Sequence, residues 1–149
     1  MTQVLVNVEG FAGVDAGVLE RSVRAVLDRH EVKEGEVSLT LQDDHGIQAL
    51  NARYLGHDRP TDVISFALHE AGEPPLGDIY IGYEQAVRQS TELEVPLSQE
   101  LVRLAVHGTL HLLGFDHPEG EDRFASEFFS LQESLVQDVD PTNGGGRGR

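Results

Sequence analysis

An apolar segment from Leu104 to Phe115, which has no charged side chain, constrains the fold more than any other feature of the chain. Pro96 and Ser98 precede it and favour the start of a helix, with Ser98 as the N-cap and Glu100 in the first turn. The apolar positions surround this helix instead of forming one stripe, which is typical of a helix buried in the core. We therefore expect a central helix, whose apolar residues are Leu101, Val102, Leu104, Ala105, Val106, Leu110, Leu112 and Leu113.

Three histidines, His107, His111 and His117, lie in and just after this segment. On a helix His107 and His111 share one face, about 6 Å apart along the axis. Gly114 can end the helix and let the chain turn so that His117 approaches the other two. Three histidines without a fourth protein ligand are typical of a catalytic zinc site, in which water takes the open position. The pattern therefore predicts one zinc ion bound by His107, His111 and His117.

Two alternatives compete with this zinc site. A single histidine at helical spacing is more often a core or surface residue than a ligand, but buried imidazoles need partners, and three at this spacing favour a metal. The spacing is also that of metzincin proteases, whose general-base glutamate follows the first histidine; here that position is Gly108. A zinc peptidase is therefore the least favoured function. The sequence leaves nickel or another divalent ion open as the native metal.

Length and composition predict a single domain. The chain has 149 residues, of which 1–140 are expected to form a single metal-dependent domain and 141–149 a disordered Gly- and Arg-rich tail. The absence of cysteine excludes thiolate ligands, a cysteine nucleophile and disulfides. No signal pattern or run of about 18 apolar residues is present, so we expect a cytoplasmic protein that does not enter a membrane.

The net charge of −15 argues against unassisted long-range attraction to nucleic acid and favours a basic protein partner. The alternative is a surface that is acidic only for solubility. Arginine outnumbers lysine ten to one, which leaves bidentate phosphate donors available locally.

Hydrophobic periodicity predicts four strands and about five helices. The expected strands are 3–8, 36–42, 62–68 and 76–83, and the last two are expected to form a hairpin-like pair. The expected helices are 15–30 with Asp15 as its cap, a short helix from Asp43 or Asp44 to Tyr54, 84–92, the central helix, and 119–136.

Three sequence blocks then match a known family in order. They are Leu50-Asn51 through Tyr54 with Asp58-Arg59-Pro60-Thr61-Asp62-Val63-Ile64-Ser65-Phe66, then Leu76-Gly77-Asp78-Ile79 with Ile81, and Val106 through His117. Over about residues 35–137 the chain resembles the YbeY family of bacterial metal-dependent endoribonucleases and rRNA maturation factors.

The resemblance implies both a fold and a function. The fold would be α+β, with a small mixed sheet of about four strands packed with about five helices. The function would be zinc-dependent cleavage of single-stranded RNA in small-subunit rRNA 3′-end maturation and ribosome quality control. The implied partners are rRNA, the small ribosomal subunit and basic ribosomal proteins.

One departure from the family concerns the substrate phosphate. Family members usually have an arginine, thought to contact this phosphate, directly after the tyrosine of the first block, where this chain has Leu55. We hypothesise that Arg59 or Arg53 supplies the positive charge, Arg59 as a catalytic and substrate-binding residue and Arg53 as a substrate-binding one. Leu55 and the acidic charge also motivate an alternative function, a ribosome assembly or binding factor whose zinc is mainly structural.

Three aspartates are candidates for the general base. Asp116 lies next to the third predicted ligand, and its alternative role is to orient a ligand histidine. Asp62 and Asp78 occupy strand positions from which we expect them to reach the cleft, and their alternative role is to bind neighbouring backbone amides.

Overall fold

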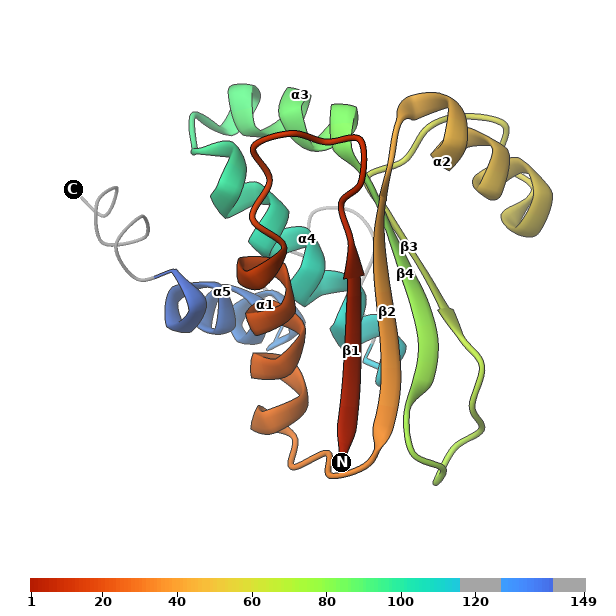
Figure 1. Ribbon diagram of the computed structural model, residues 1–149, viewed down its shortest axis with the longest axis vertical. Helices are drawn as coiled ribbons and strands as arrows, with labels where there is room; N and C mark the ends of the chain where they lie inside the picture. The colour runs from red at the N-terminus through yellow and green to blue at the C-terminus, as the bar shows by residue number, and fades with distance from the viewer. Residues whose placement is uncertain (116–126, 141–149) are drawn as a thin grey trace.

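The computed structural model describes residues 1–115 and 127–140 and has an α+β architecture (Figure 1). The elements are β1 (Thr2–Asn7), α1 (Ala16–Arg29), β2 (Gly35–Gln42), α2 (Asp44–Leu50), a π-helical turn η1 (Asn51–Leu55), β3 (Val63–Ala67), β4 (Leu76–Gly82), α3 (Tyr83–Leu93), α4 (Leu97–Leu112) and α5 (Glu127–Val139).

The four strands form one mixed sheet, in the order β1-β2-β4-β3. Strands β1 and β2 are parallel, as are β2 and β4, whereas β3 and β4 are antiparallel. The predicted fold class is confirmed.

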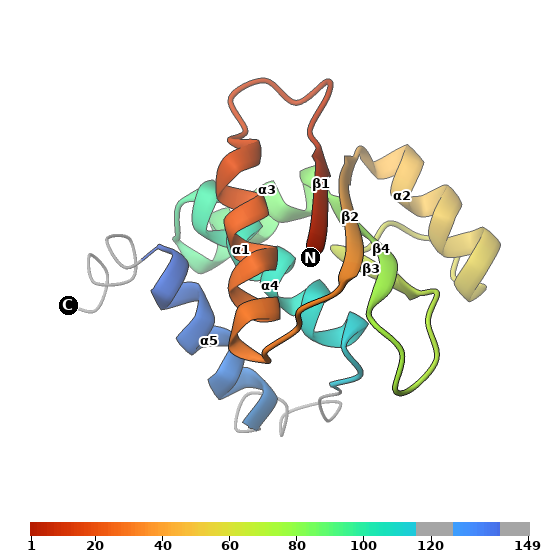
Figure 2. The same ribbon diagram turned by 60° about the horizontal axis from the view of Figure 1, so that its bottom comes forward.

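Helices α1 and α4 cover one face of the sheet, and α5 packs on the outside of both (Figures 1 and 2). The alternation of β2 explains which face they cover, because Val37, Leu39 and Leu41 are buried while the residues between them are not. In register with this stripe lie Gly77 and Ile79 of β4, and cross-strand neighbours point to the same side of a sheet. The apolar face of the sheet therefore lies under the helices.

Helix α4 is a core helix, as expected from its apolar sequence. Leu104, Ala105 and Leu112 join the apolar cluster on the sheet, whereas Val106 and Leu110 join a second cluster with α1 and α5. The helix is thus covered by apolar groups on two opposite sides.

The predicted N-cap of this helix is wrong. Pro96 is the N-cap residue and its side chain makes no capping hydrogen bond, while Ser98 lies inside the first turn. The Pro96 carbonyl accepts hydrogen bonds from the amides of Gln99 and Glu100, at 3.1 and 3.2 Å, so the helix begins before Ser98. Proline has no amide hydrogen and a fixed φ that suits a helix start, which explains the earlier beginning.

One stripe of α4 escapes full burial. Between Gln99 and Leu112 the only residues that are not buried are Arg103, His107 and His111. They are spaced by four residues and so lie on one face of the helix. This face borders the candidate site.

Helix α2 and the turn η1 lie on the opposite side of the sheet from α1 and α4 (Figures 1 and 2). Asp43 is the N-cap of α2 and accepts a hydrogen bond from the Gly46 amide at 2.7 Å, which decides between the two predicted cap residues. The π-helical turn ends at Gly56, whose left-handed φ of 75° stops the helix.

Helix α5 is described from Glu127, so the beginning of the predicted helix 119–136 lies outside the described residues. The same holds for Asp116, His117 and the predicted tail 141–149. Within the described parts of the chain, no helix has the length and apolar character that crossing a membrane requires.

Candidate metal and catalytic site

The two histidines of α4 lie side by side, as their spacing predicts. Their ring centroids are 4.7 Å apart with an interplanar angle of 62°. Both rings also contact Phe128 of α5, each with a centroid distance of 5.2 Å. Phe128 is buried in the apolar cluster that α1, α4 and α5 share. The imidazoles therefore extend from the half-buried face of α4 and pack against an aromatic side chain of α5.

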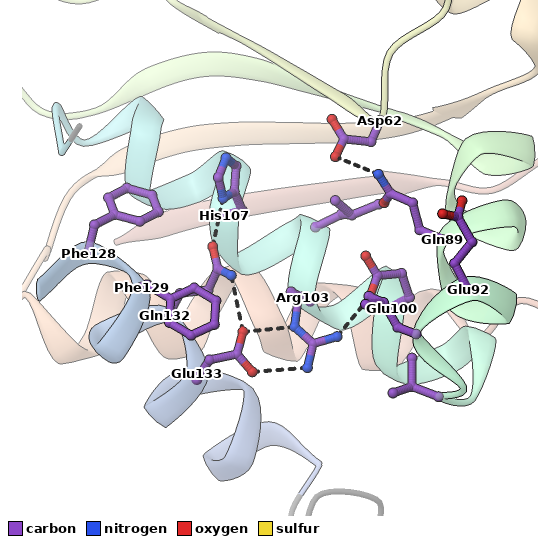
Figure 3. A pocket seen from close by; sticks show the side chains of 13 residues that line it. Asp62, Gln89, Glu92, Glu100, Arg103, His107, Phe128, Phe129, Gln132 and Glu133 are labelled. Atoms are coloured by element: carbon purple, nitrogen blue, oxygen red, sulfur yellow. Dashed lines mark hydrogen bonds and ion pairs between the residues drawn. The ribbon is translucent and has the colours of Figure 1, made fainter. Parts of the chain in front are cut away.

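His107 stands between two cavities. The larger, of about 700 Å³, lies among α3, α4 and α5 and is lined on one side by Phe128 and Phe129 (Figure 3). The smaller, of about 330 Å³, lies between β3 and α4 and is lined by His107, His111 and Leu55. Asp62 lines both cavities together with His107. A ligand bound in either cavity therefore reaches an imidazole and a carboxylate.

A chain of hydrogen bonds leads from His107 into the wall of the larger cavity (Figure 3). His107 Nδ1 lies 2.6 Å from Oε1 of Gln132, whose Nε2 donates to Glu133 Oε2 at 3.1 Å. Arg103 donates from Nε and Nη2 to the two carboxylate oxygens of Glu133, at 2.8 and 2.9 Å. Its Nη1 donates to Glu100 Oε1 at 2.7 Å. These contacts join α4 to α5 beside the histidines.

The two carboxylates around Arg103 differ in burial. The Glu100 side chain is 3 % exposed and that of Glu133 is 31 % exposed. Burial raises the pKa of Glu100, and the nearby Arg103 only partly opposes this effect. Burial also acts to lower the pKa of Arg103, but its bonds to Glu133 and Glu100 outweigh that effect, so this pKa is raised. Arg103 therefore remains positively charged.

The predicted zinc ligands are tested only in part. The structure brings His107 and His111 together, whereas His117 lies outside the described residues. In residues 1–115 and 127–140, no three potential metal ligands form a group. The histidines present fit a zinc site, because their rings lie side by side and Gln132 contacts Nδ1 of His107, so that Nε2 is the ring nitrogen that would bind a metal. The three-histidine site therefore stays a prediction.

The candidate bases Asp62 and Asp78 lie on different sides of the sheet. Asp62 accepts a hydrogen bond from Gln89 Nε2 at 3.1 Å and faces both cavities. Asp78 alternates with Gly77 and Ile79, which face α4, and it accepts a hydrogen bond from Ser38 Oγ at 2.6 Å. The prediction that Asp78 reaches the cleft is wrong, because its strand position turns it to the other face. Asp116 lies outside the described residues.

The phosphate-binding candidates Arg53 and Arg59 are exposed and line neither cavity. The Arg53 guanidinium lies 5.3 Å from the ring centroid of Tyr54. The Arg59 carbonyl accepts a hydrogen bond from Nδ2 of the buried Asn51 at 2.9 Å, which ties this loop to η1. Leu55, which is 50 % exposed, is the residue of this segment that lines the smaller cavity. The roles assigned to Arg53 and Arg59 remain predictions.

Three further residues at the site were not singled out from the sequence: Arg103, Gln132 and Glu133. Arg103 precedes His107 by one helical turn, and that spacing is a signal that could have indicated it. Gln132 and Glu133 lie on a separate amphipathic helix, where nothing in the sequence distinguishes them from surface residues.

The comparisons with known proteins agree with this architecture. Residues 11–140 match the family described as Endoribonuclease YbeY. A Persephonella marina protein of that name is 36 % identical over 146 residues, covering 93 % of this chain and 94 % of the relative. One from Desulfitobacterium hafniense is 48 % identical over 139 residues, covering 86 % and 87 %.

A solved structure with a similar fold is the solution structure of TM1509 from Thermotoga maritima. It matches with a TM-score of 0.67 and 26 % identity, covering 97 % of this chain and 94 % of that one. The match therefore extends over nearly the whole fold.

Proposed function

The chain belongs to the YbeY endoribonuclease family, and from this premise we propose that it is a zinc-dependent enzyme that cuts single-stranded RNA during 3′-end maturation of small-subunit rRNA. The observation that supports this proposal is the pair His107 and His111 beside two cavities that share Asp62. We place the scissile phosphate of the RNA next to His107, which lines both cavities. Such work on rRNA and in ribosome quality control belongs to the cytoplasm.

The proposed ligands of one zinc ion are His107, His111 and His117. Bound there, zinc would stabilise negative charge on a phosphoryl oxygen and lower the pKa of a water molecule. Asp62 is our candidate for accepting a proton beside His107, and Asp116 is a second one that also serves to orient a histidine. Arg59, with Arg53, is proposed to offset the charge that develops on the phosphate.

The proposed partners follow from charge. A protein with a net charge of −15 gains little from long-range attraction to RNA, so a basic ribosomal protein on the small subunit is proposed to bring it to its substrate. The proposed domain comprises residues 1–140.

His111→Ala tests the catalytic proposal in purified protein with an end-labelled single-stranded RNA. The variant is expected to lose zinc and cleavage together, whereas His45→Ala, on the exposed surface of α2, keeps both. Undiminished cleavage by His111→Ala would contradict the assigned site. In cells, unprocessed small-subunit rRNA 3′ ends that a His111→Ala copy does not correct would support the maturation role.

A second candidate function is a ribosome assembly or binding factor with a structural zinc. Leu55 favours it, because a leucine on the smaller cavity offers no charge to a phosphate. Leu55→Arg separates the two functions. A large rise in weak cleavage identifies a catalyst that lacks an arginine, and absence of cleavage with either residue favours the binding function.

A zinc peptidase remains the least favoured function. The position that follows His107 is a glycine packed against the sheet, so it offers no general base. Chelator-sensitive hydrolysis of a casein-like substrate would be needed to revive this function.

A further inference from the structure

We propose that the Arg103–Glu133 ion pair, acting through Gln132, fixes the tautomer of His107 and so decides which of its ring nitrogens binds the metal. Gln132 and Glu133 would then be positioning residues of the site. The inference that a ring nitrogen of His107 binds zinc rests on the proposed zinc site. The tautomer of His107 is a property of the metal-free protein, so the tautomer and the zinc site can be refuted separately.

Glu133 is held in its ionised form by its contact with Arg103. Arg103 binds both carboxylate oxygens of Glu133 in a two-pronged contact, at 2.8 and 2.9 Å. A guanidinium stays charged and stabilises the ionised form of a carboxylate that it holds in this way. An ionised carboxylate only accepts hydrogen bonds. Any group that bonds to Glu133 must therefore present a donor.

The ionised Glu133 sets the orientation of the Gln132 amide. One end of this amide faces Glu133 at 3.1 Å and the other faces His107 at 2.6 Å. Because Glu133 accepts, the NH₂ group must turn toward it, which turns Oε1 toward the imidazole. Gln132 is 5 % exposed, so water offers little compensation for the reverse orientation, in which two oxygens would face each other.

The Gln132 amide in turn sets the position of the proton on His107. The amide oxygen of Gln132 only accepts, so His107 Nδ1 must donate, and a neutral imidazole carries one proton. Nε2 is then left with a lone pair, which is what a metal ligand needs. The proton thus lies on Nδ1, on the side of α5, and the lone pair lies on Nε2.

The arrangement also limits the charge at His107. Metal-bound histidines often donate directly to a carboxylate, which raises their basicity. Here a neutral amide stands between the ring and the carboxylate, and Arg103 offsets the negative charge of Glu133. His107 is therefore oriented without a full negative charge beside it.

The test of the tautomer uses metal-free full-length protein. ¹⁵N NMR of the histidine rings, at a pH where they are neutral, is expected to show His107 protonated on Nδ1. Gln132→Leu should remove this preference, because it removes the acceptor that faces His107 Nδ1. A wild-type His107 protonated on Nε2 would overturn the proposal.

Zinc affinity, measured by competition with a chelator, gives a second readout that is independent of RNA cleavage. Gln132→Leu is expected to weaken zinc binding about 10- to 100-fold, the usual effect of removing a hydrogen-bond partner of a metal-bound histidine. Equal affinity in wild type and Gln132→Leu would contradict the proposal.

A matched pair of variants tests the role of the ion pair. Glu133→Gln and Glu100→Gln each remove one carboxylate from Arg103, but only Glu133 contacts Gln132. Glu133→Gln is expected to give mixed tautomers and weaker zinc binding, and Glu100→Gln to leave both unchanged. Equal effects of the two variants, or a pure wild-type tautomer in Glu133→Gln, would overturn the proposal. A protein with the expected tautomer that binds no zinc would instead refute the proposed metal site.

Discussion

Gly108 of α4 lies so close to β4 that a Cβ atom at this position would stand 2.8 Å from Cγ2 of Ile79. The same atom would lie 3.1 Å from Val63 Cγ2, and the Gly108 carbonyl accepts a hydrogen bond from Ser65 Oγ at 2.8 Å. The position that follows His107 thus points at the sheet, where a larger side chain would clash with Ile79. The glycine permits the close contact of helix and sheet, and no side chain at this position could act as the base of a peptidase.

Gly108→Ala is expected to destabilise the protein. Overpacking against Ile79 and Val63 costs about 1–3 kcal/mol, which exceeds the gain of up to about 1 kcal/mol from replacing a helical glycine. We expect the free energy of unfolding, measured with urea, to fall by up to about 2 kcal/mol. Gly17→Ala on the exposed surface of α1 is the control and should cause a smaller loss, because the nearest contact of its Cβ would be the exposed Asp15 side chain, at 3.2 Å from Oδ1. Equal stability of Gly108→Ala and wild type would contradict the close contact.

The raised pKa of Glu100 predicts a pH dependence of stability. Burial makes the folded protein bind the proton of the Glu100 carboxyl more tightly than the unfolded chain does. Protonated Glu100 therefore contributes its full stabilisation below the pKa that it has in the unfolded chain, and this contribution is lost as the pH rises through its pKa in the folded protein. Wild type should therefore gain stability relative to Glu100→Gln as pH falls from about 7.5 toward about 4.5. Urea unfolding of both proteins across this range measures the difference. A difference that shrinks on acidification would have the wrong sign.

Asp62→Asn is expected to slow RNA cleavage, because Asp62 is the carboxylate that both cavities share with His107. Loss of a general base lowers kcat by about 100- to 10,000-fold. Asp78→Asn, on the opposite face of the sheet, is the matched control and should keep kcat near the wild-type value. Similar kcat values for the two variants would exclude Asp62 as the base.

Much of the fold was predictable, because its signals are local. The alternation in β2 and the apolar surroundings of α4 follow from adjacent residues, and Asp15 caps α1 as expected. The start of α4 was not predictable, because both Pro96 and Ser98 are acceptable residues near a helix N-terminus. Only the backbone hydrogen bonds to the Pro96 carbonyl decide between them.

The candidate site was predictable only within α4. The pairing of His107 with His111 follows from helical spacing. Asp78 alternates with the buried Ile79 and Ile81, a local signal that it faces away from the core, whereas the contact of His107 with Gln132 joins residues 25 apart on two helices. Contacts of this kind arise from tertiary packing, which leaves no mark at short sequence separation.

The most direct test of the account is a zinc titration of metal-free protein with single-stranded RNA as the substrate. Cleavage is expected to be absent without metal, to rise with added zinc, and to saturate at about one equivalent per chain. His107→Ala should show no cleavage at the same zinc concentrations. Full cleavage without metal, or cleavage by His107→Ala that matches the wild type, would contradict the central claim that these histidines form a catalytic metal site.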